Sequence, residues 1–265
     1  METKKIIGLE FDHFGRRLGL RILPKHPKLG LNLVLHPVSI FRYFEFAFAC
    51  GNVPKEANTC LDISSPRLFS LYVASNEDDL TTTRAIVSAL ELRNVTCEIG
   101  VTQLSKLSFP RYDCIWSLSV IEHITGEYDD IWAIQSMYDA LRPGGCLILT
   151  VPVDRSHWEE YRERDYYGTQ EAGDNGRYFF HRYYDEASIE KRLLEPIGQP
   201  RVHKQWFGER VEGHFSKYEA HWMQQGLPYV VNDPREIADH YQEYGSWGAM
   251  LGRGVCGITI VKRDK

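Results

Sequence analysis

The spacing of hydrophobic and polar positions divides the chain into three zones. In the first, residues 1–58, aromatic and apolar residues are mixed with Pro, Gly and basic residues. Within it, residues 39–50 predict a helix in which Phe41, Phe44 and Phe48 share one face. We interpret this zone as an N-terminal helical or cap segment.

The second zone alternates short apolar runs with amphipathic segments. Strands are predicted at residues 59–63, 95–101, 112–118 and 146–153, and helices at residues 66–74, 80–92 and 128–141. The last of these strands is a continuous apolar run, which is typical of a strand covered on both faces. Strands alternating with helices indicate βαβ units. We therefore expect an α/β protein with a doubly wound, mostly parallel sheet, helices on both faces, and a second strand that is short or missing.

The third zone, residues 153–265, is rich in Tyr, Trp, His and charge. Helices are predicted at residues 187–194, 215–225 and 234–244, and strands at residues 201–207 and 254–262. We interpret residues 59–265 as one domain that carries insertions at about residues 154–185 and 208–250.

Composition narrows the class of protein. The chain has 265 residues, which suffice for one large domain with additions or two small ones. Its net charge is −5 and it has no long Lys/Arg run, which argues against a nucleic-acid partner. Its six cysteines form no CxxC pair and are expected to be buried free thiols in a reducing compartment.

No membrane span is expected. The N-terminus lacks the apolar core of a signal peptide, and the apolar stretch at residues 29–50 is interrupted by His36, Arg42 and Glu45. We therefore expect a cytoplasmic protein. The ten histidines show no HxxxH or HxH spacing with carboxylates, so we expect no metal site.

Polar residues follow the predicted strands at the edge where doubly wound sheets bind ligands. The turn at residues 62–66 follows the first strand, and its backbone N–H groups can receive the polar end of a cofactor. A helix that is merely N-capped after a strand is the alternative. Gln103 follows the next strand and can pair with an adenine edge, although by itself a surface glutamine is the simpler interpretation.

Two longer segments point to a family. Residues 112–124 read YDCIWSLSVIEHI, and residues 140–152 read ALRPGGCLILTVP. This pair resembles class I S-adenosylmethionine-dependent methyltransferases, in which a YD strand ending in an EH turn precedes a helix, an LRPGG turn and a strand ending in VP. The LDISS segment at residues 61–65 fits the first motif of the same family, although Ser64, Ser65 and Pro66 stand where the family has glycines.

The resemblance implies S-adenosylmethionine as cofactor and a small-molecule acceptor. The implied cofactor contacts are Asp62, Ser64, Ser65, Glu77, Asp78, Gln103, Leu104, Ser117, Leu118 and Ser119. The first three would hold the methionine part, one of the two acids the ribose, residues 103–104 the adenine, and residues 117–119 the sulfur end. Glu122 and His123 would begin the loop that faces the acceptor, and the two insertions would select it.

The cofactor's sulfonium makes its methyl group electrophilic, so the protein mainly aligns the reactants. A general base would assist, and His123 and His157 are the candidates because imidazole suits that role near neutral pH. Further candidates for the acceptor pocket are Tyr166, Tyr167, Arg177, His181, His214 and His221.

The expected activity is methyl transfer to an O or N atom. A non-catalytic methyltransferase-fold protein that binds or regulates a partner is the alternative. A nicotinamide oxidoreductase would need a GxGxxG turn after the first strand, and the sequence has none there.

Overall fold

The structure is a computed structural model that describes residues 6–75, 95–96, 110, 112–165, 173, 176–198, 200–225 and 234–263, with only the backbone at residues 95–96, 221–225 and 234–236. Its strands are β1 (Cys60–Asp62), β2 (Val95–Thr96), β3 (Tyr112–Leu118), β4 (Leu141–Val153), β5 (Trp158–Arg162), β6 (Tyr178–Tyr183), β7 (Arg201–Glu209), β8 (Tyr241–Tyr244) and β9 (Gly254–Val261). Its α-helices are α1 (Leu9–Ile22), α2 (Pro27–Leu35), α3 (Ile40–Asn52), α4 (Arg67–Ala74), α6 (Asp130–Ala140), α7 (Glu186–Ser188), α8 (His214–Gln225) and α9 (Pro234–His240).

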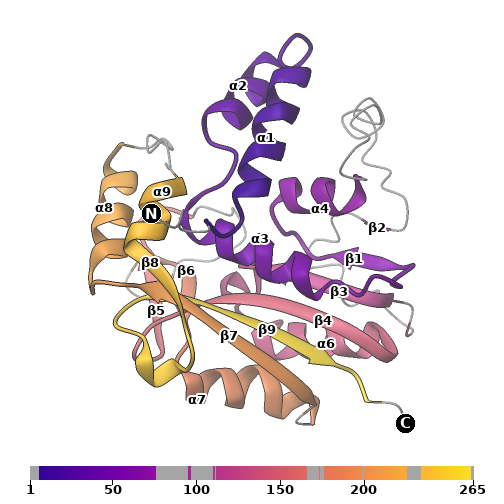
Figure 1. Cartoon of the computed structure of the whole chain (residues 1–265). Coiled ribbons are helices and arrows are strands. Elements are labelled where there is room, and N and C mark those ends of the chain that lie inside the picture. The colour runs from indigo at the N-terminus through magenta and orange to yellow at the C-terminus, as the bar shows by residue number, and fades with distance from the viewer. Residues whose placement is uncertain are drawn as a thin grey trace.

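Seven of these strands form one sheet in the order β2-β1-β3-β4-β9-β7-β8 (Figure 1). The pairs β1–β2, β1–β3 and β3–β4 are parallel, whereas β9 runs antiparallel to both of its neighbours, β4 and β7. The helices α1, α3 and α4 lie on one side of the sheet, and α6 and α7 lie on the other (Figure 1). The expected α/β class with a doubly wound, mostly parallel sheet is confirmed.

The two faces of the sheet bury different side chains. On the α3 face, aromatic rings dominate: Phe44 stacks on Phe207 with ring centroids 4.9 Å apart, and Phe69 meets Trp116 edge-on at 5.5 Å. On the α6 face the core is aliphatic, with Ile134 among its fully buried members. This division fits the aromatic spacing of residues 39–50, which placed phenylalanines on one helix face.

Three cysteines form a row across neighbouring strands. Cys60 is paired in register with Cys114, and Cys114 with Cys146. All three are buried free thiols, as is Cys256, while Cys50 is exposed. For four of the five cysteines that the structure describes, the prediction of a buried free thiol is confirmed.

The predicted elements agree closely with the observed ones in the central zone. The strand at residues 112–118 coincides with β3, and the helix at residues 128–141 corresponds to α6, which begins after Asp129 caps the Ile131 and Trp132 N–H groups. The predicted helix at residues 80–92 lies outside the described residues, as does the strand at residues 95–101 beyond β2.

One predicted helix is partly wrong. Residues 234–244 were expected to be helical throughout, but α9 ends at His240 and the next four residues form β8, which pairs antiparallel with β7. The edge of β7 carries backbone N–H and C=O groups that need partners, and β8 supplies them. The helical pattern of residues 234–244 contains no information about this pairing. The β5–β6 hairpin and helices α1 and α2 were not predicted.

The helices were also compared with the length of a membrane span. Among the described residues, no single helix is long and apolar enough to cross a bilayer. The pair α2 and α3, which is bent by 90° at the break between the two helices, passes the length and composition test only when taken together.

Candidate functional site

The turn between β1 and α4 is held together by Asp62. The Asp62 carboxylate is buried, with Oδ1 accepting the Ser65 N–H at 3.0 Å and Oδ2 accepting the Ser70 hydroxyl. Burial raises the pKa of Asp62, against the effect of these hydrogen bonds. Between these residues, Ser64 is exposed and has a φ of 52°, a left-handed conformation in which glycine is free of strain. The turn therefore keeps the geometry of a glycine turn.

This turn is fastened to the end of β3. The Ile63 N–H donates to the Trp116 carbonyl at 2.9 Å, and the Leu118 N–H donates to the Ser65 hydroxyl oxygen at 2.9 Å. The two predicted halves of the cofactor site, residues 62–65 and 117–119, are thus brought into direct contact. Parallel pairing of β1 with β3 explains this, because both strands end at the same edge of the sheet.

Helix α3 reaches the same edge from the aromatic face. Glu45 is buried; its Oε1 accepts the Ser119 hydroxyl and, at 3.2 Å, the Thr150 hydroxyl, while its Oε2 accepts from Arg42 at 2.7 Å. Arg42 also donates to the Leu118 carbonyl at 2.9 Å. Ser119 itself has a φ of 48°. No local pattern indicates this role of Glu45, because its partners are 74 and 105 residues away.

Glu122 and His123 form a short 3-10 helix, Ile121–His123, directly after β3. Glu122 is only 2% exposed, and its Oε2 has no hydrogen-bond partner among the residues that the structure describes. Burial raises the pKa of Glu122 to about 8, and the nearby charge of Glu45 acts in the same direction. A buried carboxyl group that has one oxygen without a partner among the described residues, and a pKa close to neutrality, has the properties of an acid or base that acts on a ligand.

His123 has the opposite electrostatic character. Its Nδ1 lies 2.6 Å from the Phe180 carbonyl, which only accepts hydrogen bonds, so Nδ1 carries the proton. Burial lowers the pKa of His123 to about 3. His123 is therefore a neutral imidazole at physiological pH and a weak base.

These residues face a pocket of about 300 Å³. Its floor contains Glu45, Ser119, Glu122 and His123. Its walls come from α3, the β5–β6 hairpin, α8 and β9, and they include the aromatic side chains Phe41, Phe180, Tyr183, Phe215 and Tyr218. Polar groups on an aromatic-lined floor are typical of a small-molecule site.

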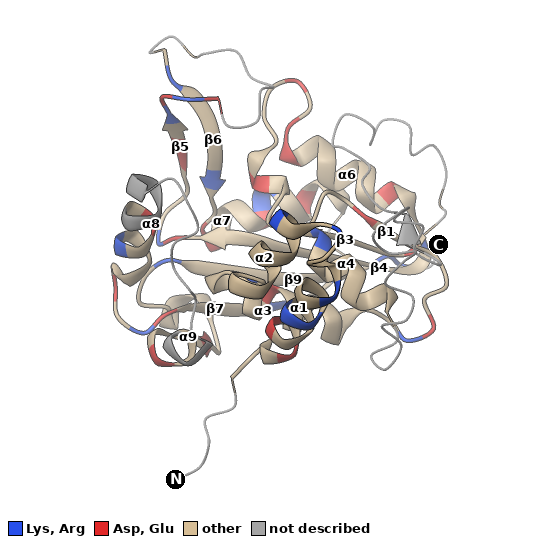
Figure 2. Cartoon of the chain, turned by 90° about the horizontal axis from the view of Figure 1, so that it is seen from above, with Lys and Arg blue, Asp and Glu red and all other residues tan. Residues whose placement is uncertain are grey.

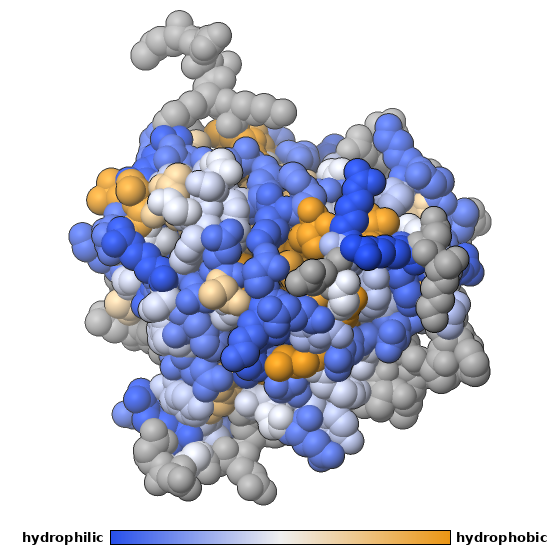
Figure 3. Space-filling model, turned by 90° about the horizontal axis from the view of Figure 1, so that it is seen from below, coloured by the Kyte–Doolittle hydropathy of each residue, from blue (hydrophilic) through white to orange (hydrophobic). Residues whose placement is uncertain are grey.

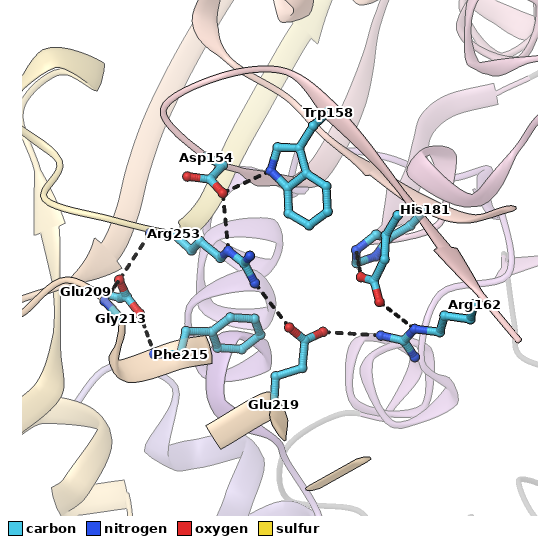
Figure 4. Close-up of polar contacts among 10 residues, drawn as sticks. Asp154, Trp158, Arg162, His181, Glu209, Gly213, Phe215, Glu219 and Arg253 are labelled. Atoms are coloured by element: carbon cyan, nitrogen blue, oxygen red, sulfur yellow. Dashed lines mark hydrogen bonds and ion pairs between the residues drawn. The ribbon is translucent and has the colours of Figure 1, made fainter. Parts of the chain in front are cut away.

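A chain of charged side chains connects the elements around this pocket (Figure 4). Glu219 of α8 bridges two guanidinium groups, Arg253 at 3.1 Å and Arg162 at 3.3 Å. Arg253 continues to Asp154 at 3.2 Å, and Arg162 continues to Glu160. Burial raises the pKa of Glu219. These ion pairs tie α8 to β5 and β9, so they fix one wall of the pocket.

Glu160 completes the chain on the side of β6. Its Oε2 lies 3.0 Å from His181 Nε2. Burial acts to raise the pKa of Glu160, but the close contact with His181 and the hydrogen bond from Arg162 outweigh it and lower the value to about 2. Glu160 is therefore ionised, and it holds both His181 and Arg162 at the pocket wall.

The second predicted base lies elsewhere. The His157 N–H donates to Asp185 at 3.1 Å, and its ring lies 5.9 Å from that of Tyr184. His157 is not among the residues that line the pocket of about 300 Å³. The structure therefore does not bring His157 together with His123, although both follow strands of the same sheet.

The remaining predicted residues divide into two groups. Glu77, Asp78, Gln103 and Leu104, together with Tyr166 and Tyr167, lie outside the described residues, as does the side chain of His221. Of the other C-terminal candidates, His181 lines the pocket, whereas Arg177 and His214 do not. Among the described residues, no group of three or more His, Cys, Asp or Glu side chains is placed to hold a metal ion.

Comparison with known proteins gives a likeness of structure only. No family model matches the chain, and no curated protein matches it in sequence. Its structure is similar to that of an S-adenosylmethionine-dependent methyltransferase from Archaeoglobus fulgidus, with a TM-score of 0.43, 14% identity, and coverage of 96% of this chain and 98% of that one.

Two further solved structures show a likeness of the same degree. Phosphoethanolamine N-methyltransferase 2 of Haemonchus contortus, in complex with S-adenosyl-L-methionine, has a TM-score of 0.45 and 15% identity over 96% of this chain; the chain spans 60% of its length. Coclaurine N-methyltransferase, bound to N-methylheliamine and S-adenosylhomocysteine, has a TM-score of 0.44 and 12% identity over 81% of this chain and 68% of that one.

Proposed function

We propose that the protein is an S-adenosylmethionine-dependent methyltransferase that transfers a methyl group to an O or N atom of a small-molecule acceptor. One observation carries the proposal. The pocket at the carboxyl ends of β3 and β4 is lined by the buried Glu122, whose Oε2 has no hydrogen-bond partner among the described residues, and by Ser119 and Pro152 of the two segments that resemble the family's motifs. Strand order and motif order both support this assignment.

The described part of the cofactor site fits such a group. Ser64 stands exposed in the left-handed conformation of a glycine turn, and the buried hydroxyl of Ser117 has no hydrogen-bond partner among the described residues. We assign the methionine end to the Asp62–Ser65 turn and the sulfur end to residues 117–119. S-adenosylmethionine supplies an electrophilic methyl group when bound.

In this proposal Glu122 holds the proton that the acceptor loses. A buried carboxylate with a pKa near 8 takes a proton from an ammonium or hydroxyl group more readily than an exposed one does. His123, the base expected from the sequence, instead holds the loop in place through its hydrogen bond to Phe180. The aromatic walls and the Glu219 bridge exclude water from the acceptor and orient it.

The test is methyl transfer from labelled cofactor to a panel of small amines and alcohols. The wild-type chain labels at least one acceptor, and Glu122→Gln lowers its turnover by about 10²–10⁴-fold, the usual contribution of a general base. His157→Gln serves as the control outside the pocket and leaves turnover near the wild-type rate. Equal turnover by Glu122→Gln and the wild type would remove the assigned role of Glu122.

A second function is favoured by one feature of the turn. Both carboxylate oxygens of Asp62 and the hydroxyl oxygen of Ser65 already accept hydrogen bonds from groups of the protein. The Ser119 hydroxyl donates its hydrogen bond to Glu45. The polar groups at the ends of β1 and β3 thus bond to one another and not to a cofactor. This is the arrangement expected of a non-catalytic methyltransferase-fold protein that binds or regulates a partner. Absence of cofactor binding by a folded chain would support this alternative.

A further inference from the structure

The hairpin of helices α1 and α2 rises from the sheet layer, with its bend farthest from the strands (Figure 1). It exposes four leucines: Leu20, Leu29, Leu31 and Leu35 have exposed fractions of 60%, 50%, 52% and 43%. Of the eight large apolar side chains exposed in the part of the chain that the structure describes, half therefore lie within residues 20–35. Scattered exposed leucines are common, but such clustering marks an interaction surface.

The leucines face outward because the two helices pack through glycines. A Cβ atom at Gly19 would lie 2.7 Å from the Gly30 carbonyl oxygen, and one at Gly30 would lie 2.7 Å from the Leu23 Cα. The backbones are thus in direct contact and leave no room for large side chains between them. Lys28, Leu31 and Leu35 follow the spacing of one helix face, so this face of α2 is both apolar and basic.

The charge of the hairpin is opposite to that of the whole chain. Residues 13–44 contain no Asp or Glu, although the chain has a net charge of −5. Within the hairpin, Arg16 is paired with Asp12 at 2.7 Å, and the other basic side chains, Arg17, Arg21, Lys25 and Lys28, are exposed. In the view from above, blue Lys and Arg segments lie around α1 and α2 (Figure 2).

The opposite side of the molecule has a different character. Seen from below, the surface is mainly hydrophilic, and its apolar patches are separate from one another (Figure 3). On this face the apolar residues therefore do not gather in one segment as the leucines of the hairpin do.

We propose that the α1–α2 hairpin docks the protein on a membrane surface that carries anionic lipid headgroups. The leucines enter the boundary between headgroups and acyl chains, and the basic side chains pair with the lipid phosphates. A nucleic acid would satisfy the charge but offers no apolar layer for the leucines. A second copy of the hairpin would bury the leucines, but the basic side chains of the two copies would repel each other.

Vesicle co-sedimentation of the full chain tests this proposal. The probe is a vesicle of equal parts phosphatidylcholine and phosphatidylserine, compared with one of phosphatidylcholine alone. We expect binding to the anionic vesicle, loss of that binding in high salt, and about tenfold or greater weakening in Lys25→Glu/Lys28→Glu. Equal sedimentation of the wild type with and without vesicles would overturn the proposal, as would equal binding to both compositions.

The apolar contribution has its own matched pair of variants. Leu31→Ser/Leu35→Ser removes the two exposed leucines that share a face of α2 with Lys28 and is expected to weaken vesicle binding by about tenfold or more. Leu251→Ser, at a leucine that is 44% exposed far along the chain, leaves binding unchanged. Circular dichroism confirms that each variant is folded. Light scattering that shows a dimer of the wild type, abolished by Leu31→Ser/Leu35→Ser, would overturn the lipid assignment in favour of a second copy.

Discussion

Glu122 and His123 are neighbours in sequence and in space, yet burial moves their pKa values in opposite directions. The distance from His123 Nε2 to Glu122 Oε1 is 3.8 Å. Burial penalises the charged form of each group, so it raises the pKa of the carboxyl to about 8 and lowers that of the imidazole to about 3. Both side chains are therefore largely neutral near pH 6, and of these two groups Glu122 is the one that changes charge near neutral pH.

Glu122→Gln is expected to change how stability depends on pH. The pKa of Glu122 rises from an ordinary value of 4.5 to about 8 on folding, so between these values the folded state holds a proton that the unfolded state has released. The wild type then loses about 1.4 kcal/mol of stability for each pH unit gained in that window. Arg42 and Arg182 moderate this loss, and Glu45 adds to it.

Urea denaturation at a series of pH values measures this effect. The stability of Glu122→Gln relative to the wild type is expected to increase steadily from pH 5 to pH 8, because glutamine removes the titrating group. A difference between the two proteins that stays constant across this range would show that Glu122 has an ordinary pKa.

His123 is expected to remain neutral at physiological pH. Its ring nitrogens, followed by NMR from pH 5 to pH 8, should show the tautomer protonated at Nδ1, because that proton is donated to the Phe180 carbonyl. His123→Asn identifies the signal by its disappearance. A titration of His123 with a midpoint between pH 6 and pH 7 would contradict the burial that lowers its pKa.

Two serines with positive φ form a matched pair. Ser64→Gly is expected to change the free energy of unfolding by less than about 1 kcal/mol, because relief of the left-handed strain offsets the loss of the serine's own contacts and the added freedom of the unfolded chain. Ser119→Gly relieves similar strain but loses a hydrogen bond to the buried Glu45 carboxylate, worth about 1.5–3 kcal/mol, so it should destabilise. Urea unfolding of both variants measures the contrast, and a larger loss of stability in Ser64→Gly than in Ser119→Gly would refute the strain argument.

Asp130 anchors α6 through a buried ion-pair network. It accepts from Tyr184 at 2.7 Å and is paired with Arg182 at 3.0 Å and with Arg192. Asp130→Asn leaves the buried Arg182 without a full counter-charge and is expected to cost about 3 kcal/mol or more. Asp129→Asn is the control: asparagine caps a helix as well as aspartate does, and the pair of Asp129 with Arg192 is partly exposed, so the cost should stay below about 1 kcal/mol. Similar losses in the two variants would show that the buried pairs of Asp130 add nothing beyond the cap and the exposed pair of Asp129.

The fold was largely predictable because its central strands are mainly apolar. The predicted strands at residues 112–118 and 146–153 lie in β3 and β4, and the second of them is a continuous apolar run of the kind that burial on both faces produces. The edge strand β8 gave no such signal, since its pairing depends on the exposed edge of β7. Helices α1 and α2 escaped prediction because they pack through Gly19 and Gly30, which lower helix propensity.

Site residues were predictable only where their position follows from neighbouring residues in the sequence. The turn around Asp62 and the loop of Glu122 and His123 follow strands, so their position at the edge of the sheet was expected. Glu45 and Glu219 were not predicted, because each takes its role from partners on distant elements, Ser119 and Thr150 for the first and Arg162 and Arg253 for the second. The lowered pKa of His123 was not predictable either, since it comes from burial of the ring beside Phe180, and its role as a base stays a prediction.

The central claim is that this chain holds S-adenosylmethionine at the β1–β3 edge, and calorimetric titration with S-adenosylhomocysteine tests it most directly. We predict saturable heat with micromolar affinity for the wild type, retained by His157→Gln and lost in Asp62→Ala, with circular dichroism confirming that both variants are folded. Absence of binding heat from the folded wild-type chain, with either S-adenosylhomocysteine or S-adenosylmethionine, would contradict the claim.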